Sequence, residues 1–233
     1  MEPTTQPMSG RRAQAARNDQ RILEAARAVF TADPEAPIAA VAAEAGVGIA
    51  ALYRRYRSKE ELLQRLALDG LRGYIAETEA ALADDGDPWD AFAGFLRRSL
   101  DSGAGSLTVR LAGAFTPTEE LQRAGRDAHA ATQRLLDRAK AAGALHPDIT
   151  VGDISLLLEQ LQAVQVADPD RTRQLRHRYL ALLLDSLHRP ATPLPGPPPS
   201  WEEISRRYDG AGARHSVGGG GRPGTPGSAA RPG

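Results

Sequence analysis

The chain has 233 residues, 29 basic and 29 acidic side chains, and no cysteine. The lack of cysteine excludes a disulfide framework, a cysteine-based zinc site and a catalytic thiol. No apolar run approaches the roughly 20 residues of a membrane span, and no signal-peptide core is present, so we expect a cytoplasmic protein. Alanine, leucine and arginine dominate, and no segment alternates apolar and polar residues as a strand would, which predicts an all-α fold over residues 1–189.

Charge is distributed unevenly along the chain, although the formal net charge is zero. Residues 1–66 carry ten basic against eight acidic side chains, whereas residues 67–189 carry fourteen against eighteen. A locally basic head on an acidic body suits local binding of phosphate groups. The overall balance therefore does not argue against a nucleic-acid partner.

The N-terminal segment 1–17 is polar and basic, with no acidic residue after Glu2. We expect a flexible arm, which either touches the DNA backbone or minor groove or has no role in binding. A helix follows to about Ala32, and residues 33–37 form a loop that contains two prolines.

Residues 37–56 have the pattern of two short helices joined by a glycine turn. Gly46 stands where a helix end favours positive φ, and Gly48 opens the second helix. Leu52 and Tyr56 point to the core from one side of that helix. This arrangement predicts a helix-turn-helix, whose second helix enters the major groove of DNA. The arc left free on that helix contains Ile49, Ala50, Tyr53 and Arg54.

A basic cluster adjoins this motif. Residues 45–59 contain no acid but four basic side chains, of which Lys59 is the last. Ser58 and Glu61 have the spacing of a capping box, which starts a third helix. Lys59 then lies in its first turn, where free backbone N–H groups can bind the same phosphate. A solvated basic corner would show the same charges, but the turn, the core spacing and the capping box together favour DNA binding.

The stretch from Val41 to Leu63 resembles the signature of the TetR family of bacterial transcriptional repressors. The resemblance is strong over residues 18–66 and weaker over 67–189. It implies a three-helix DNA-binding head at 18–66 and a helical regulatory and dimerisation body at 67–189, with about nine helices in all. The residues that match the signature are Ala42, Ala45, Gly46, Val47, Leu52, Tyr53, Ser58, Lys59, Glu60 and Leu62.

Three departures from the signature affect the expected DNA contacts. Pro37 replaces a threonine that caps the second helix and reaches a phosphate, so one contact is lost. Gly48 and Ala50 replace serine and glycine at the start of the recognition helix, and Arg55 replaces a histidine. The expected DNA-contacting set is Gly48, Ile49, Ala50, Tyr53, Arg54, Arg55 and Lys59.

Helix starts are well marked in the body. A long helix from Ser58 to about Asp84 links the head to the body and can act as a lever between them. We also expect a short helix at 107–115. A helix is expected to start at Thr116-Pro117-Thr118, and the residues predicted to cap the other helices are Asp87, Thr150 and Asp168.

The last helix of the body has an unusually wide apolar arc of about 200°. Such a helix is either central to its own core or buried on two sides. In the TetR family the last two helices pair with their copies across a two-fold axis, so we favour a homodimer through residues 151–188. The expected interface residues are Leu157, Leu161, Tyr179, Leu183, Leu184 and Leu187.

The family resemblance also places a pocket for a small-molecule effector among the helices between residues 62 and 143. The aromatic residues of this region could equally be ordinary core, and Arg110 and His129 are the polar groups that could orient a ligand. The full candidate set is Trp89, Phe92, Phe95, Arg110, Phe115 and His129.

Two classes of function remain open at this stage. The first is a sequence-specific DNA-binding regulator, expected to be a repressor that an unknown small-molecule effector releases from a pseudo-palindromic operator. The second is a helical adaptor without specific DNA binding. An enzyme is not expected, because the five histidines are scattered and no nucleophile elbow, metal-binding histidine pair or phosphate loop occurs. No metal and no cofactor are expected.

The segment 190–233 differs in composition from the rest of the chain. Proline crowds its start, and glycine, proline, serine and alanine fill its end. Such a segment buries too little apolar surface to offset chain entropy. We expect this tail to be mostly disordered, with one short amphipathic piece around Trp201, Ile204 and Tyr208.

Overall fold

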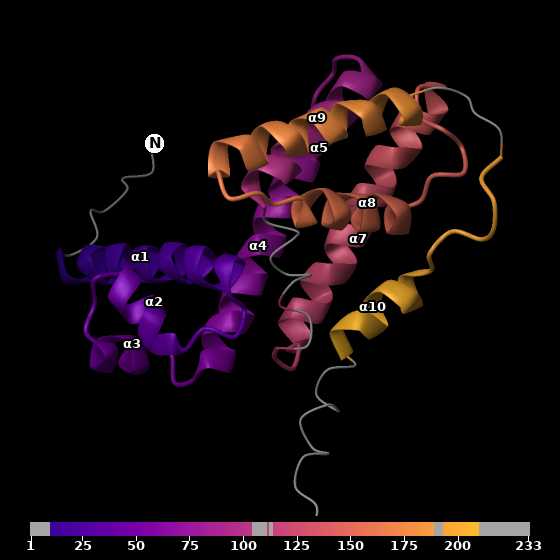
Figure 1. Ribbon diagram of the computed structural model, residues 1–233. Helices are drawn as coiled ribbons and strands as arrows, with labels where there is room; N and C mark the ends of the chain where they lie inside the picture. Colours follow the sequence, from indigo (N-terminus) through magenta and orange to yellow (C-terminus); the bar gives the residue numbers. More distant parts are fainter. Residues whose placement is uncertain (1–9, 104–110, 112–113, 189–192, 210–233) are drawn as a thin grey trace, which may run out of the picture.

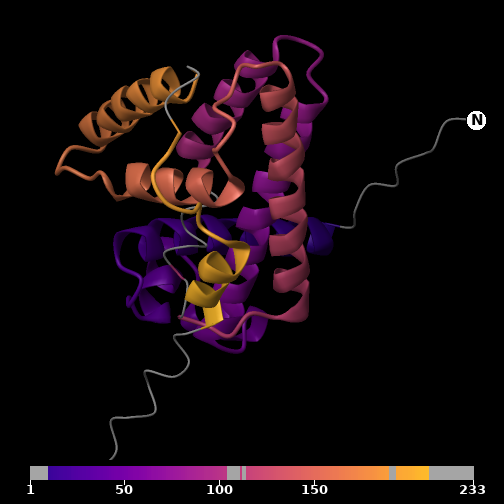
Figure 2. The same cartoon turned by 90° about the vertical axis from the view of Figure 1, so that its right-hand side faces the viewer.

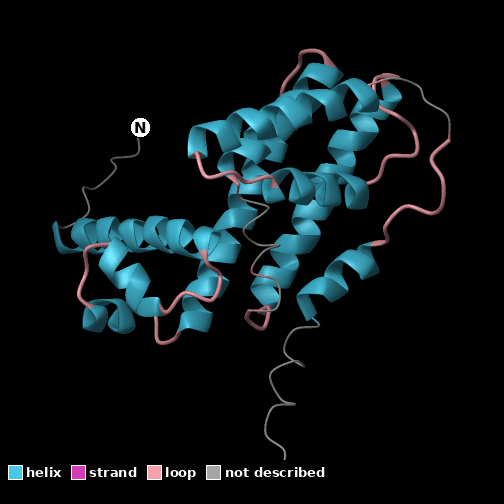
Figure 3. Ribbon diagram, viewed as in Figure 1, coloured by secondary structure: helices cyan, strands magenta, loops and turns pink. Residues whose placement is uncertain are grey.

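The computed structural model describes residues 10–103, 111, 114–188 and 193–209, and every regular element in these ranges is an α-helix (Figures 1 and 3). The predicted all-α class is confirmed. No helix in these ranges is long and apolar enough to cross a membrane. The helices are α1 (Gly10–Ala32), α2 (Ile38–Glu44), α3 (Ile49–Arg55), α4 (Lys59–Leu82), α5 (Pro88–Ser102), α7 (Glu119–Ala141), α8 (Val151–Ala163), α9 (Pro169–Leu187) and α10 (Trp201–Asp209).

The head consists of α1, α2, α3 and the first turns of α4, which surround one buried apolar cluster. Phe30, Leu52 and Leu62 are fully buried at its centre. The same cluster continues into the body through four residues: Leu111, Phe115, Leu121 and Ala124. Because one close-packed core spans the head and the start of α7, a displacement of α7 changes the packing of the head.

Helix α4 leaves the head and runs through the body beside α7 and α5 (Figure 1). A second apolar cluster fills the space among α5, α7, α8 and α9, with Phe92, Phe95 and Leu136 fully buried in it. In Figure 2, α7 stands as a long rod next to α4, and α8 and α9 lie to the left of its upper half. The body is therefore a helical bundle in which α4 is shared with the head.

The helix starts of the body agree with the sequence pattern. Asp87, Thr118, Thr150 and Asp168 each accept hydrogen bonds from the first-turn backbone N–H groups of the helix that follows. Thr150 forms a full capping box with Asp153. Each cap satisfies donors that a helix start leaves without an intrahelical partner.

One expectation about the ends of the chain needs correction. Helix α1 begins at Gly10, so residues 10–17 are helical and not part of a flexible arm; alanine, arginine and glutamine there are good helix formers. Within the tail, residues 201–209 form α10. The rest of the expected arm (1–9), the end of the tail (210–233) and most of the expected helix at 107–115 lie outside the described residues.

Candidate nucleic-acid interface

The turn between α2 and α3 depends on Gly46. Its φ of 62° lies in the left-handed region that favours glycine. A Cβ at this position would lie 3.1 Å from Nη2 of Arg21. That guanidinium donates a 2.8 Å hydrogen bond to the carbonyl oxygen of Ala45, at the C-terminal end of α2. The predicted positive φ is confirmed, and Arg21 of α1 fixes the place where the chain turns toward α3.

Helix α3 has one buried and one exposed side, as its spacing predicted. Leu52 is fully buried, and Tyr56, which ends the helix, is also buried. On the other side, the exposed fractions of Ile49 and Tyr53 are 43% and 47%. Gly48, Ala50 and Arg54 are exposed on the same side. The Arg54 guanidinium has no hydrogen bond or ion pair with any described residue, so it is available to an external partner.

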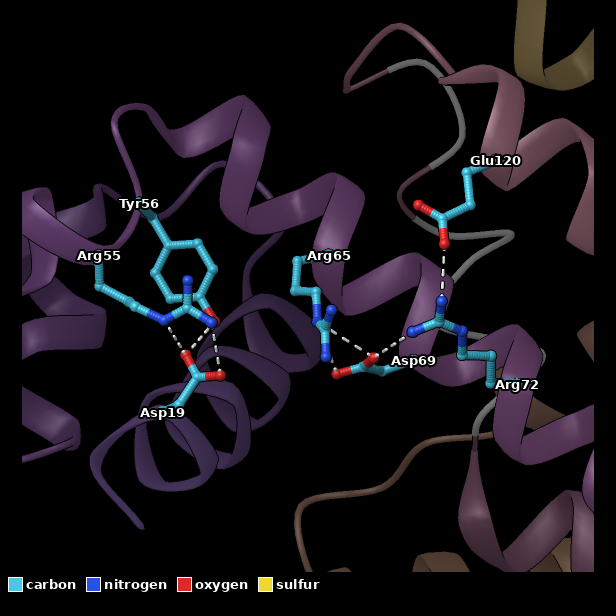
Figure 4. Close-up of polar contacts among 7 residues, drawn as sticks. All are labelled: Asp19, Arg55, Tyr56, Arg65, Asp69, Arg72 and Glu120. Atoms are coloured by element: carbon cyan, nitrogen blue, oxygen red, sulfur yellow. Dashed lines mark hydrogen bonds and ion pairs between the residues drawn. The ribbon is translucent and has the colours of Figure 1, made fainter. Parts of the chain in front are cut away.

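Arg55 is instead bound to helix α1. Its Nε and Nη2 donate to the two carboxylate oxygens of Asp19 over 2.7 and 2.8 Å. The hydroxyl of Tyr56 donates to Asp19 Oδ1 over 2.6 Å, and the Arg55 guanidinium stacks 5.0 Å from the centre of the Tyr56 ring (Figure 4). Asp19 thus fastens the C-terminal end of α3 to α1. Sequence analysis did not identify it, because it stands 36 residues before Arg55.

The electrostatics of this cluster favour the ionised carboxylate. Burial alone would raise the pKa of Asp19, but the hydrogen bonds from Arg55 and Tyr56 outweigh it, and the pKa is lowered. The bond to Asp19 raises the pKa of Arg55, and burial together with the same carboxylate raises the pKa of Tyr56. Around neutral pH, Asp19 is therefore ionised, Arg55 is charged and Tyr56 is protonated, so the contact persists.

We expect Asp19→Asn to destabilise the protein by about 1–2 kcal/mol at pH 7. This is below the value for a fully buried charged hydrogen bond, because Arg55 is half exposed. Since the pKa of Asp19 is lowered on folding, its contribution is complete above the unfolded pKa of about 4 and is lost as the pH falls through the folded value. Urea unfolding between pH 3 and 7 should therefore show a smaller pH dependence in the variant.

The matched control is Asp127→Asn, because Asp127 is an exposed carboxylate on α7. It should leave both the midpoint and the pH dependence as in the unmodified protein. An Asp19→Asn variant with an unchanged unfolding midpoint at pH 7 would show that this cluster adds nothing to stability.

Lys59 contacts the loop between α1 and α2. Its Nζ donates to the carbonyl oxygen of Pro34 over 3.2 Å and lies 5.3 Å from the centre of the Phe30 ring. The start of α4 is capped as predicted, because Ser58 Oγ accepts from the Glu61 N–H over 3.1 Å. The return bond is displaced by one residue, since the Glu61 carboxylate accepts from the N–H of Arg57, not of Ser58.

The head and the body are also joined by polar contacts. Both backbone polar groups of Thr116, in the loop before α7, bind side chains of α4. Its N–H donates to Glu60 Oε1 over 3.0 Å, and its carbonyl accepts from Gln64 Nε2 over 2.8 Å. Arg72 of α4 pairs with Glu120 of α7 at 2.7 Å (Figure 4). The start of α7 is therefore fastened to α4 at two levels.

The expected effector residues that the structure describes lie in different parts of the molecule. Phe92 and Phe95 are buried in the body core, and Phe115 lies in the core shared with the head. Trp89 stacks on His188, with ring centres 4.2 Å apart. His129 stacks on Trp201 of α10 at 4.7 Å, and Arg110 lies outside the described residues. Phe92, Phe95 and Phe115 are packed as core residues in this structure, and their role at an effector pocket stays a prediction.

An apolar opening does exist between α5, α8 and α9. Its empty volume is about 220 Å³, part of which is open to solvent, less than the 300–1,000 Å³ common for ligand pockets. It is lined by Leu96, Ile154, Leu157, Leu158, Leu161, Leu180, Leu183 and Leu187.

The expected interface residues of α8 and α9 fall into two groups. Leu161, Leu184 and Leu187 are buried within the body core of a single chain, so they are core residues and not a free surface. Leu157 and Leu183 are half buried, and Tyr179 is exposed. Leu182, absent from the expected set, is the most exposed of the large apolar side chains, at 59%.

The fold and this interface define a helix-turn-helix DNA-binding protein with a separate helical body. A model of bacterial regulatory proteins of the tetR family matches residues 22–66, and one described as the C-terminal domain of SbtR-like transcriptional regulators matches residues 87–189. The chain belongs to the TetR family of transcriptional regulators.

Solved structures agree with this assignment. A TetR transcription regulatory protein from Mycobacterium vanbaalenii is 30% identical over 76% of this chain and 99% of its own, with a TM-score of 0.51. A TetR regulator from Streptomyces coelicolor is 27% identical over 74% and 99%, with a TM-score of 0.54. The regulator LfrR from Mycobacterium smegmatis, solved with proflavine, shares the fold at 23% identity over 77% and 99%, with a TM-score of 0.57. No curated protein sequence matches significantly.

Proposed function

We propose that this protein is a homodimeric repressor that binds a pseudo-palindromic operator and is released from it by a small molecule. The observation that carries the proposal is the exposed side of α3. Ile49, Ala50, Tyr53 and Arg54 are all exposed there, while Arg55 and Tyr56 hold the end of the helix against α1. An exposed recognition helix on a fixed support suits entry into the major groove.

The dimer provides the second half of this proposal. Two copies related by a two-fold axis would present two α3 helices about one turn of DNA apart, and the operator would share that symmetry. Tyr179 and Leu182 of α9 are exposed apolar side chains, and Leu157 of α8 is half buried, which supports pairing through these helices. Unpaired, these side chains would remain in water.

Release by an effector rests on how the head and body are joined. Helix α4 belongs to both, and the start of α7 shares a core with the head. A ligand that binds one arrangement of these helices better than another would change the spacing of the two α3 helices. LfrR, a regulator of the same fold, was solved with proflavine, which makes planar organic compounds a reasonable first set of effectors to screen.

The test of the proposal is selection of binding sites from random double-stranded DNA with the purified protein. A regulator of this kind should select an inverted repeat, and the selected DNA should bind far more tightly than random DNA at physiological salt. Recovery of no preferred sequence, with weak binding that depends only on salt, would favour the adaptor function instead.

Lys59→Ala tests whether the start of α4 binds phosphate. We expect it to weaken binding to the selected DNA and to random DNA about equally, and to make the salt dependence shallower by roughly one unit. This requires Lys59 to exchange the Pro34 carbonyl for a phosphate, which the flexible lysine chain allows. The measurement is the DNA dissociation constant across a salt series.

Lys140→Ala is the control, because Lys140 is the only other lysine of the chain and lies in the last turn of α7. It should not change the slope. A Lys59→Ala variant with an unchanged slope and an altered sequence preference would contradict the phosphate assignment.

A further inference from the structure

The segment 194–206, which we call the strap, follows α9 in the chain and lies against the outside of α7 and α8 (Figures 1 and 2). Three contacts hold it. The N–H of Leu194 donates to Asp148 Oδ2 over 3.1 Å, Pro199 packs on Gly152 of α8, and the Trp201 ring packs on α7. We propose that the strap is a detachable clamp that docks in a preformed slot and holds the N-terminal half of α7 against the head.

Gly152 makes the slot on α8. A Cβ at this position would lie 2.6 Å from the carbonyl oxygen of Pro199 and 3.0 Å from its Cβ, both closer than van der Waals contact allows. Glycine within a helix costs about 1 kcal/mol relative to alanine. The close approach of the Pro199 backbone gives this glycine a packing role. By contrast, a Cβ at Gly73 of α4 would meet nothing within 4 Å.

Trp201 fills a second notch, on α7. Its ring centre is 4.7 Å from that of His129, and its Cη2 atom would lie 3.9 Å from a Cβ at Gly125, an ordinary contact distance. The exposed fraction of Trp201 is 43%, so the ring is bound on one side only. A ring held this way can leave its notch without opening the body core.

Helix α10 depends on this docking. Ser200 and Glu203 form its N-terminal capping pair, with bonds of 2.7 and 3.2 Å. A nine-residue helix is nevertheless too short to be stable alone in water. Its helical structure therefore requires the contacts with α7 and α8, and docking and folding of the strap should occur together.

The position of the notch explains what the strap can control. Gly125 directly follows Ala124, which lies with Leu121 in the core shared with the head. Glu120, one turn earlier, pairs with Arg72 of α4. The strap thus presses on the part of α7 that joins head and body, and its release should loosen that junction. Docking and release of the strap require neither DNA nor an effector.

The experiment uses the full chain with Trp89→Phe, which leaves Trp201 as the only tryptophan. Gly152→Ala is added to evict the strap, and Gly73→Ala is the matched control, a helical glycine with free space around it. Acrylamide quenching reports the exposure of Trp201, and hydrogen exchange reports opening of residues 119–129. We expect Gly152→Ala to make Trp201 nearly as quenchable as N-acetyltryptophanamide and exchange in 119–129 about tenfold faster, with neither change in the control.

Trp201→Ala, which leaves α8 untouched, should accelerate the same exchange and guards against a folding defect in the Gly152 variant. Trp201 that is fully quenchable before any glycine is changed, or that stays protected in Gly152→Ala, would overturn the docking. Release of Trp201 in Gly152→Ala, with no faster exchange in 119–129 either there or in Trp201→Ala, would overturn the clamp.

Discussion

Leu182→Arg is expected to convert the protein from a dimer into a folded monomer. The side chain is 59% exposed in a single chain, so an arginine there remains in water and leaves the protomer core intact. In a dimer that pairs α8 and α9, the same arginine would be buried without a partner. One unpaired buried charge costs about 3–5 kcal/mol and the two-fold axis places two of them in the interface, so dimer affinity should fall at least about 100-fold.

Analytical ultracentrifugation across a concentration series provides the measurement, with far-UV circular dichroism to show that the monomer is folded. Ala181→Arg is the control: Ala181 is also exposed on α9 but lies about 100° around the helix from Leu182. It should stay dimeric. An unmodified protein that sediments as a monomer at micromolar concentration, or a Leu182→Arg variant that stays dimeric, would rule out this face as the interface.

Leu184→Arg would not serve for the same test, because Leu184 is buried in the core of the single chain and the variant would unfold. The wheel shows how far the apolar residues extend around α9. It could not show which part faces the chain's own core, because that depends on where α5 and α8 lie. The structure turns Leu180, Leu184 and Leu187 inward and leaves Leu182 outside.

Features set by neighbours in sequence were predicted well. The caps at Asp87, Thr150 and Asp168 depend on side chains within one helical turn, and the φ of Gly46 depends on its own turn. The buried and exposed sides of α3 follow from the spacing of apolar and polar residues within its own seven residues. These signals need no knowledge of the fold.

Contacts between distant segments were missed for the opposite reason. Asp19 is one polar residue among many in α1, and nothing near it in sequence points to Arg55 or Tyr56. The docking of α10 was missed for the same reason. Composition alone predicts disorder for the tail, and the notch at Gly125 and the slot at Gly152 that receive it lie on other helices. The candidate effector aromatics show the same limit, since Phe92 and Phe115 belong to different cores.

Arg54→Ala is expected to weaken operator binding by about 1–3 kcal/mol per half-site and to relax base preference at one symmetric pair of positions. Of the side chains on the exposed arc of α3, only Arg54 has a guanidinium that can bond guanine O6 and N7 together. Ile49 and Ala50 suit thymine methyl groups instead, and Gly48 and Ala50 are small enough to let the start of α3 approach the bases. With two half-sites, the total loss is about 2–6 kcal/mol, against the roughly 4–10 kcal/mol that separates specific from random DNA.

Arg55→Ala is the contrasting variant, because Asp19 already binds the Arg55 guanidinium. It should weaken binding to all sequences alike, through loss of the contact that holds α3 to α1, and should keep every base preference. The measurement is binding-site selection with each variant beside the unmodified protein, followed by affinities for operators altered one base pair at a time. A loss of base preference in Arg55→Ala, with all preferences kept in Arg54→Ala, would mean that α3 enters the groove with a different face.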